Sequence, residues 1–483
     1  MDRLSNALRE LKQTDLYPFH MPGHKRRGIT ESLKDICLHD ITEIDGFDNL
    51  HHPEGIIKEE QEFAAKLFGA EESFFLVNGS SCGILAAIEA VASHSQSRIL
   101  MGRNAHKSAY NGLYLANIRA DYLYPERMPG VSFVGKITAE SIERALKDHT
   151  SYDGIFITSP TYEGVVSDIK EICEIAHEKG IPVIVDEAHG AHLGLWGGDG
   201  YFPASALAQG ADIVIQSLHK TLPSMTQTAI LHVQGKLIDR QRLKMHLGVF
   251  QSSSPSYILM ESMSSCLHFC EKNREILIEG YKKRLKEFYR EGKKLSCIEI
   301  IDTDLINSLT EGKINVKMDP GKIIIGVGKS GMCGRQLYDI LRENYHLQME
   351  MSAGDYVIAM TSVMDTDEGF QRLIRALREI DAQVIPTLQT SFKEKKDIFL
   401  PEVFYSIGEA FRMKEEIIAL EESAGRISKE FIYLYPPGIP VIVPGEKISR
   451  ELLEYLQEVR ELGLSVQGLQ DYEQKKICCI RNE

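Results

Sequence analysis

The sequence predicts an α/β protein with a mostly parallel β-sheet flanked by helices. Five short apolar runs end in small or polar residues and are followed by helix-like patterns; they lie at 73–81, 98–108, 154–164, 181–190 and 212–220. Continuous apolar strands that alternate with amphipathic stretches, such as SDIKEICEIAHEKG, are typical of a parallel sheet. In such sheets ligands bind beyond the carboxyl ends of the strands, so the polar residues there are candidates for one shared site.

After about residue 260, the sequence pattern predicts smaller structural units. CEKNREILIEGYKKRLKEFYREGKK is typical of a long helix, and GKIIIGVG, GRQLYDILRENY, YVIAMTS and DEGFQRLIRALREIDAQ then alternate between strand-like and helix-like patterns. A polar segment at 388–401 has the composition of a linker, and a closing helix is expected near 448–462. The predicted organisation is an N-terminal segment at 1–50, a large domain at 51–284, a small α+β domain at 285–387 and a C-terminal α+β domain at 400–483.

Composition narrows the class of partner and compartment. The net charge of −14 disfavours nucleic acid, which needs clustered Lys and Arg, and is compatible with a cationic small molecule. Nine cysteines without a CxxC pair form neither a disulfide framework nor a zinc ribbon, and a reducing cytosol fits best. The N-terminus has no apolar leader and no run of about 18 apolar residues occurs, so a cytoplasmic protein without a membrane span is expected.

The strongest single candidate is the lysine in SLHKTLPSMTQTA, directly after the apolar run ADIVIQ. A lone lysine at a strand end can simply extend to solvent. Desolvation and nearby cations, however, depress the pKa of a lysine and make it a nucleophile toward carbonyl carbons. Ser217 and His219 flank Lys220 with groups that can bind a phosphate or pass a proton.

A second candidate is the acidic pair in VIVDEAHGAHLG, where three apolar residues directly precede Asp186. This carboxylate could bind a metal with His189 and His192, hold magnesium in an NTPase, or pair with the protonated pyridine nitrogen of pyridoxal phosphate. The NTPase alternative needs a phosphate loop, and IIIGVGKSG has Ile323 where the pattern requires glycine. A metallohydrolase built on the two histidines stays an alternative.

The pyridoxal phosphate hypothesis requires a phosphate site and a downstream lysine, and both are present. VNGSSCG opens a helix-like segment with Ser80 and Ser81, and backbone N–H groups at a helix N-terminus bind phosphate. Lys220 follows Asp186 by one helix and one strand. His106, in RNAHKS at another strand end, could stack on a flat cofactor ring.

Together the motifs carry a family resemblance. FHMPGHK, VNGSS, RNAHKS, SPTYEG, VDEAHGAH, SLHKTLPSMTQTA and YLYPPGIPVIVPGE occur in the order seen in the Orn/Lys/Arg decarboxylases. These are fold-type-I pyridoxal-phosphate enzymes of the aspartate aminotransferase superfamily. The resemblance runs from about residue 17 to 468. It is to the short form of the family, without the wing domain that precedes HMPGH in the long members.

The resemblance implies a role for each matching residue. Lys220 would bond the cofactor covalently, Asp186 would contact its pyridine nitrogen, and His106 and Ala188 would lie against the two ring faces. The phosphate would be held or flanked by four side chains, those of Ser80, Ser81, Ser217 and His219. A homodimer or higher homo-oligomer is implied, with the active site at the interface and part of QSSSPS (251–256) supplied by the partner. Pro223 stands where many relatives have a small residue.

The implied reaction is α-decarboxylation of a basic amino acid to CO2 and an amine used in polyamine biosynthesis. The family's short members favour arginine over lysine and ornithine. Either His219 or Lys220 could protonate the α-carbon. Candidates to bind the distal cation of the substrate are the carboxylates of Glu163, Asp48, Glu421 and Glu422. An aminotransferase is an alternative, since Arg335 or Arg342 could bind an α-carboxylate.

Overall fold

The computed structural model describes residues 2–94, 96–148, 151–310, 315–386, 401–435, 438–461 and 465–481. The chain divides into two compact units, one formed by Met1–Val91 and Ile169–Gly280, the other by Ala92–Asp168 and Tyr281–Glu483. The predicted linker at 388–401 lies almost wholly outside the described residues.

Four strands form the sheet portion of the first unit, in the spatial order β1 (Glu72–Leu76), β8 (Ala229–Val233), β7 (Ile213–Gln216) and β6 (Val183–Asp186). β6 and β7 are parallel, whereas β8 runs antiparallel to both β7 and β1. All residues of β6, β7 and β8 are buried, which explains their unbroken apolar sequences. The carboxyl ends of the parallel pair therefore share one edge.

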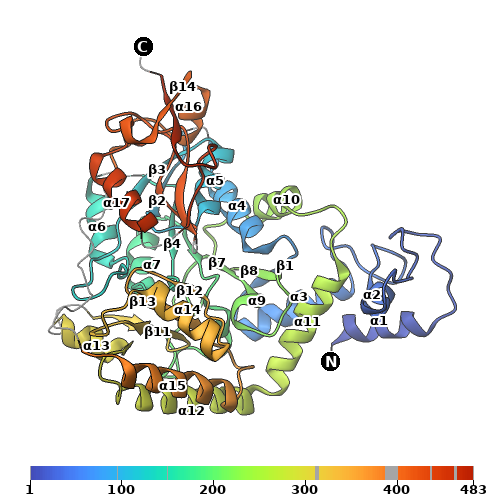
Figure 1. Cartoon of the computed structure of the whole chain (residues 1–483). Helices are drawn as coiled ribbons and strands as arrows, with labels where there is room; N and C mark the ends of the chain where they lie inside the picture. Colours follow the sequence, from blue (N-terminus) through green and yellow to red (C-terminus); the bar gives the residue numbers. More distant parts are fainter. Residues whose placement is uncertain are drawn as a thin grey trace. The chain divides into compact units, whose positions relative to one another are not determined.

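Helices precede, separate and follow these strands along the chain. They are α1 (Arg3–Gln13), α2 (Glu31–His39), α3 (Ile56–Phe68), α4 (Gly79–Val91), α7 (Ile169–His177), α8 (Ala191–Trp196), α9 (Leu218–Thr221), α10 (Arg240–Phe250) and α11 (Tyr257–Lys272); α12 (Arg274–Gly292) continues into the second unit. The alanine-rich α4 is mostly buried. It packs against α10, which lies beside it in Figure 1. α4 begins directly after β1, so its N-terminus faces the loop at the end of that strand.

The second unit holds three parallel strands and several small sheets. The parallel strands are ordered β4 (Gly154–Thr158), β2 (Arg98–Gly102) and β3 (Arg119–Leu123). An antiparallel sheet follows the order β12 (Met351–Ser352), β13 (Tyr356–Met360), β11 (Lys322–Gly326) and β9 (Glu299–Ile301). β5 (Val165–Val166) pairs with β10 (Lys317–Met318). In Figure 1 α14 (Gly334–Tyr345) lies against β13.

The C-terminal part of this unit is also α+β. β14 (Glu415–Ala419) pairs with β18 (Lys476–Ile480), and β15 (Ile432–Tyr435) lies between β16 (Ile439–Ile442) and β17 (Ser465–Gln467). The remaining helices of the unit are α5 (Lys107–Ala116), α6 (Ala139–Asp148), α13 (Thr303–Leu309), α15 (Asp367–Gln383), α16 (Ile407–Arg412), the 3₁₀ turn η1 (Leu420–Glu422) and α17 (Arg450–Glu461). Across the described ranges, every helix is too short or too polar to cross a bilayer.

Candidate active site

The central pair of the site is Asp186 and Lys220. Asp186 is the last residue of β6, and Lys220 lies in the one-turn helix α9, directly after the neighbouring parallel strand β7. The two side chains therefore reach the same edge of the sheet. Lys220 Nζ lies 3.0 Å from His189 Nε2, and the positive charge of Lys220 favours the ionised form of Asp186.

Asp186 occupies a nearly dry environment. Its side chain is only 3% exposed, and Oδ1 accepts a 3.1 Å hydrogen bond from the backbone N–H of Ala188. Burial raises the pKa of Asp186, whereas the charge of Lys220 and the amide of Ala188 lower it. A buried carboxylate of this kind is stabilised by a cation, which makes Asp186 a suitable partner for a protonated ring nitrogen.

His219 is held in one tautomer. Its Nδ1 lies 2.8 Å from the backbone carbonyl of Thr228, which can only accept, so Nδ1 carries the proton and Nε2 is the basic nitrogen. Burial lowers the pKa of His219, and the neighbouring charge of Lys220 lowers it further. The imidazole is therefore neutral near pH 7 and can accept a proton or a hydrogen bond at Nε2.

An anion cradle forms where β1 and β7 end. Ser217 Oγ donates to Ser80 Oγ over 3.0 Å, which joins the first turn of α4 to the residue before α9. Gly79 starts α4 at φ +75°, a conformation that favours glycine. Ser81 is exposed in the same turn. Two hydroxyls beside the unpaired N–H groups of a 13-residue helix suit a phosphate.

The residues at this sheet edge fit pyridoxal phosphate. The cradle offers hydrogen-bond donors for the phosphate, Asp186 offers a buried anion for the ring nitrogen, and Lys220 offers an amine for the aldehyde. Ala188 is buried beside Asp186 and has a side chain small enough to pack under a ring.

Sequence reasoning missed the contact between His189 and Lys220, because it considered His189 only as a metal ligand. The spacing in DEAHG, with a histidine three residues after Asp186, is a signal that could have placed it near the strand end. The described residues contain no cluster of three or more His, Cys, Asp and Glu that could hold a metal ion. The metallohydrolase alternative therefore has no support within that part of the chain.

The predicted segment 251–256 lies next to the start of the cradle in its own chain. Gln251 Oε1 accepts from the backbone N–H of Val77 over 2.9 Å, and the Ser252 amide donates to Asn78 Oδ1 over 3.3 Å. Whether a partner subunit supplies this segment stays a prediction.

Asp48, a predicted substrate ligand, makes structural contacts in the first unit. Its carboxylate accepts backbone hydrogen bonds of 2.8–3.1 Å from Asn49, Glu54, Gly55 and Ile57. These amides hold the loop before α3. Burial raises the pKa of Asp48, but the amides of Glu54, Gly55, Asn49 and Lys58 outweigh it and lower the pKa.

Other predicted residues belong to the second unit. His106 is the N-cap of α5, where its Nδ1 accepts from the Ser108 backbone N–H. Glu163 Oε1 accepts a 2.8 Å hydrogen bond from the Tyr356 hydroxyl. Glu421 and Glu422 are exposed on η1.

The two arginines of the aminotransferase alternative are on α14. Arg335 pairs with Asp339 at 2.8 Å, and Arg342 pairs with Glu343 at 2.8 Å. Both are thus engaged with carboxylates of their own helix.

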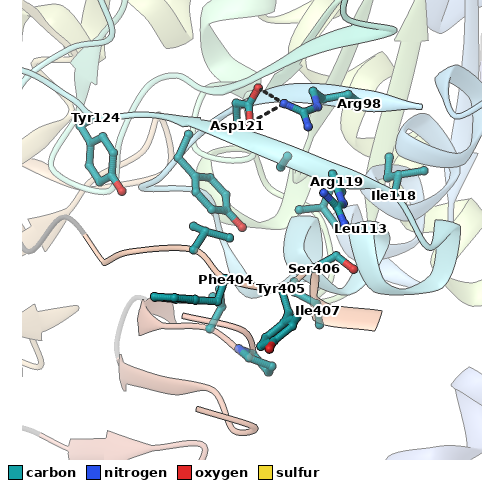
Figure 2. Close-up of a pocket in the computed structure, with 15 residues that line it drawn as sticks. Arg98, Leu113, Ile118, Arg119, Asp121, Tyr124, Phe404, Tyr405, Ser406 and Ile407 are labelled. Carbon is teal, nitrogen blue, oxygen red and sulfur yellow. Dashed lines mark hydrogen bonds and ion pairs between the residues drawn. The ribbon is translucent and has the colours of Figure 1, made fainter. Parts of the chain in front are cut away.

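A pocket of about 300 Å³ lies in the second unit. In Figure 2 the ion pair of Arg98 with Asp121 lies across this pocket from Phe404 and Tyr405. It is lined by residues 98, 113, 118–122, 124, 403–407, 443 and 444. The lining contains none of the predicted site residues, so the pocket carries no part of the candidate active site.

Comparisons with known proteins bear on the family and the fold. The family model described as "Orn/Lys/Arg decarboxylase, major domain" matches residues 3–326, and "Orn/Lys/Arg decarboxylase, C-terminal domain" matches residues 396–474. The arginine decarboxylase of Bacillus anthracis is 33% identical, over 97% of this chain and 95% of its own. That of Bacillus subtilis is 33% identical, over 94% and 92%.

Solved structures confirm the predicted fold class. The lysine decarboxylase of Francisella novicida superposes with a TM-score of 0.84 at 20% identity, over 100% of this chain and 81% of its own. The constitutive lysine decarboxylase of E. coli gives 0.79 at 20% identity, over 100% and 82%. At this identity the likeness shows the fold alone, a mostly parallel sheet with flanking helices.

The two family matches together span most of the chain, and the relatives match at 33% identity over nearly their whole length. The chain therefore belongs to the Orn/Lys/Arg decarboxylase family, the carboxy-lyases of basic amino acids, and membership implies pyridoxal phosphate as cofactor.

Proposed function

We propose that this chain decarboxylates L-arginine to CO2 and agmatine. The decarboxylation of a basic amino acid follows from the family, and the choice of arginine is supported by the similarity to arginine decarboxylases over nearly the whole chain. The observation that carries the proposal at the site is the buried Asp186 beside Lys220 at one sheet edge.

Pyridoxal 5′-phosphate would be held by the strand-end residues of the first unit. Ser80, Ser217 and the N-terminus of α4 would bind the phosphate, with Ser81 and His219 beside it. Asp186 would bind the pyridine nitrogen and Lys220 would bond the aldehyde carbon. The ring faces would contact Ala188 and, as the family resemblance implies, His106.

When bound, the cofactor supplies an electron sink for the electron pair that CO2 leaves behind. Asp186 would keep the proton on the ring nitrogen, since a facing cation stabilises its buried charge.

Proton transfer falls to three neighbouring groups. Lys220 must lose a proton before its amine can act as a nucleophile, and His189 at 3.0 Å is placed to take that proton. The α-carbon must gain a proton after CO2 departs, and His219 and Lys220 are the candidates. His219 would act through Nε2, because Nδ1 is bound to the Thr228 carbonyl.

The distal guanidinium of the substrate needs a carboxylate or an aromatic face. Glu163 is the candidate with an ordered partner, since Tyr356 orients its carboxyl group. Glu421 and Glu422 stay candidates on η1. Asp48 is the weakest, because its carboxylate already accepts several backbone hydrogen bonds.

The proposed setting is a cytoplasmic homodimer or higher homo-oligomer that works in polyamine biosynthesis, with its active site at the interface and part of 251–256 lent by the partner. All nine cysteines are unpaired thiols, which suits a reducing compartment.

The test is a comparison of substrates. Purified protein with added pyridoxal phosphate is incubated with L-arginine, L-lysine or L-ornithine, and CO2 and the amine are quantified. We expect the highest kcat/KM with arginine, with CO2 and agmatine in equal amounts. A preference for lysine or ornithine would overturn the substrate. Pyridoxamine phosphate and a keto acid in place of CO2 would overturn the decarboxylase itself and favour the aminotransferase.

A further inference from the structure

A buried ion pair joins the loop that carries His106 to the C-terminal region of the same unit. Arg103 directly follows β2, Glu446 follows β16, and Arg103 Nη2 lies 3.0 Å from Glu446 Oε2. The two side chains are 7% and 0% exposed. Arg103 Nη1 also donates to the carbonyl of Pro440 at 2.6 Å, and Glu446 Oε2 accepts from the Val443 amide at 2.8 Å.

Aromatic rings and backbone bonds complete this connection. The guanidinium of Arg103 lies 5.4 Å from the ring centre of Tyr110 and 5.5 Å from that of Tyr122. The Tyr110 hydroxyl donates to the Arg103 carbonyl at 2.6 Å. Four residues after Arg103, the amide of Lys107 donates to the Gly438 carbonyl at 3.2 Å. Residues 103–107 are thus fixed at both ends.

Stability alone does not require such a pair. Apolar side chains of similar volume serve a buried position as well or better, whereas an ion pair fixes one geometry. Burial raises the pKa of Glu446 and the charge of Arg103 lowers it, so the carboxylate depends on its partner. His106, three residues after Arg103, caps α5 within the fixed segment.

We propose that Arg103 and Glu446 are positioning residues that set the place of the His106 imidazole from the C-terminal region. The inference rests on the proposed function, in which His106 lies against the cofactor ring. The C-terminal region then contributes to cofactor binding without touching the cofactor.

The test compares Glu446→Gln, His106→Ala and the double variant with the wild-type chain. Amide hydrogen exchange of peptides that cover 103–113 is measured on cofactor-free protein. The dissociation constant of pyridoxal phosphate is then measured by fluorescence titration, and the visible circular dichroism of the bound cofactor is recorded. Asp121→Asn is the matched control, because it breaks the half-exposed ion pair with Arg98 on the adjacent strand.

We expect faster exchange at 103–113 in Glu446→Gln, a dissociation constant about tenfold higher and altered circular dichroism, by analogy with other residues that orient a ligand-binding group. The double variant should bind no more weakly than His106→Ala, because Glu446 acts through His106. Unchanged exchange at 103–113, or losses that add in the double variant, would overturn the proposal.

An unpaired buried Arg103 can unfold the chain, so Arg103→Met with Glu446→Leu provides a second, apolar variant with the same expectations. The exchange measurement needs neither cofactor nor substrate. A chain that fails to decarboxylate arginine yet shows the change in exchange would refute the proposed function and leave the Arg103–Glu446 connection standing.

Discussion

Lys220 is the residue on which the chemistry depends most. We expect Lys220→Ala to lose the visible absorption of bound cofactor and to lower kcat by at least about 10³-fold, because no other amine is proposed to bond the aldehyde. Absorption spectra and CO2 release check both. Lys236→Ala, an exposed lysine of the same unit, is the control and should keep both. Normal turnover in Lys220→Ala would refute the central assignment.

His189 offers a separate test of proton transfer. Because its Nε2 lies 3.0 Å from Lys220 Nζ, we expect His189→Leu to keep the visible absorption while kcat falls about 10²-fold. Steady-state kinetics and a spectrum of the same sample measure the two effects. His52→Ala, an exposed histidine, is the control. An unchanged kcat in His189→Leu would leave His189 with a packing role only.

The site residues that the sequence could place are those that follow predicted strands. Asp186 and Lys220 each end an apolar run, so the rule that parallel strands end at one edge brings them together. The rule gives no side-chain direction within the turn that follows, which is why the neighbour of Lys220 was missed. The hydrogen bonds that Asp48 accepts were not predictable either, because its amide partners come from a loop whose path no periodicity predicts.

The proposed phosphate-binding role of the first turn of α4 can be tested through one glycine. Gly79 has φ +75°, and an added Cβ would meet only the Gln227 carbonyl at an ordinary 3.8 Å, so the cost of alanine lies in the backbone alone. We expect Gly79→Ala to lower stability by about 1 kcal/mol and to weaken cofactor binding, since the N–H groups of the first turn shift.

Gly69 is the matched control for that experiment. It ends α3 at φ +77° with open space around it, so Gly69→Ala should lose similar stability. Thermal unfolding of the cofactor-free variants compares the stabilities, and titration with pyridoxal phosphate compares the affinities. Equal weakening of cofactor binding in both variants would contradict a phosphate role for α4.

Element types were largely predictable, and their pairing was not. The apolar runs at 73–81, 98–108, 154–164, 181–190 and 212–220 each overlap a strand of the structure. The sequence analysis did not include β8. Composition could not have given its direction, because an antiparallel strand buried on both faces has the same apolar composition as a parallel one. The four-residue α9 is too short to produce a helical period.

The fold class and the family of the whole chain could be predicted from the sequence, because strand–helix alternation and ordered motifs extend along most of it. A buried polar network in the first unit was not accessible, since it joins distant residues. Ser73 Oγ lies 2.7 Å from His232 Nδ1, His232 Nε2 lies 3.3 Å from Gln216 Oε1, and Gln216 Nε2 donates to Glu187 Oε2 at 2.6 Å. No local pattern predicts that these side chains meet.

This network makes the stability of the chain depend on pH at both ends of a window. Burial, together with the nearby charge of Asp186, raises the pKa of Glu187 from 4.5 to about 8, although hydrogen bonds from Ala206 and Gln216 lower it. The folded state then keeps a proton that the unfolded state releases, so the free energy of unfolding falls as the pH rises from 4.5 toward about 8. Burial lowers the pKa of His232 from 6.5 to about 3. Here the unfolded state binds a proton that the folded state does not, so the free energy of unfolding falls as the pH drops from 6.5 toward about 3.

Between pH 4.5 and 6.5 the two effects oppose each other, so their sum predicts a plateau with a decline on each side. Glu187→Gln should flatten the decline between pH 6.5 and about 8, and His232→Gln should flatten the decline below pH 4.5. Thermal unfolding of cofactor-free protein across this range measures both, and each variant serves as the control for the other. If Glu187→Gln loses stability above pH 6.5 as steeply as the wild type, Glu187 is already ionised in the folded state. A carboxyl group that is charged in both states does not change the pH dependence of the free energy of unfolding in this range.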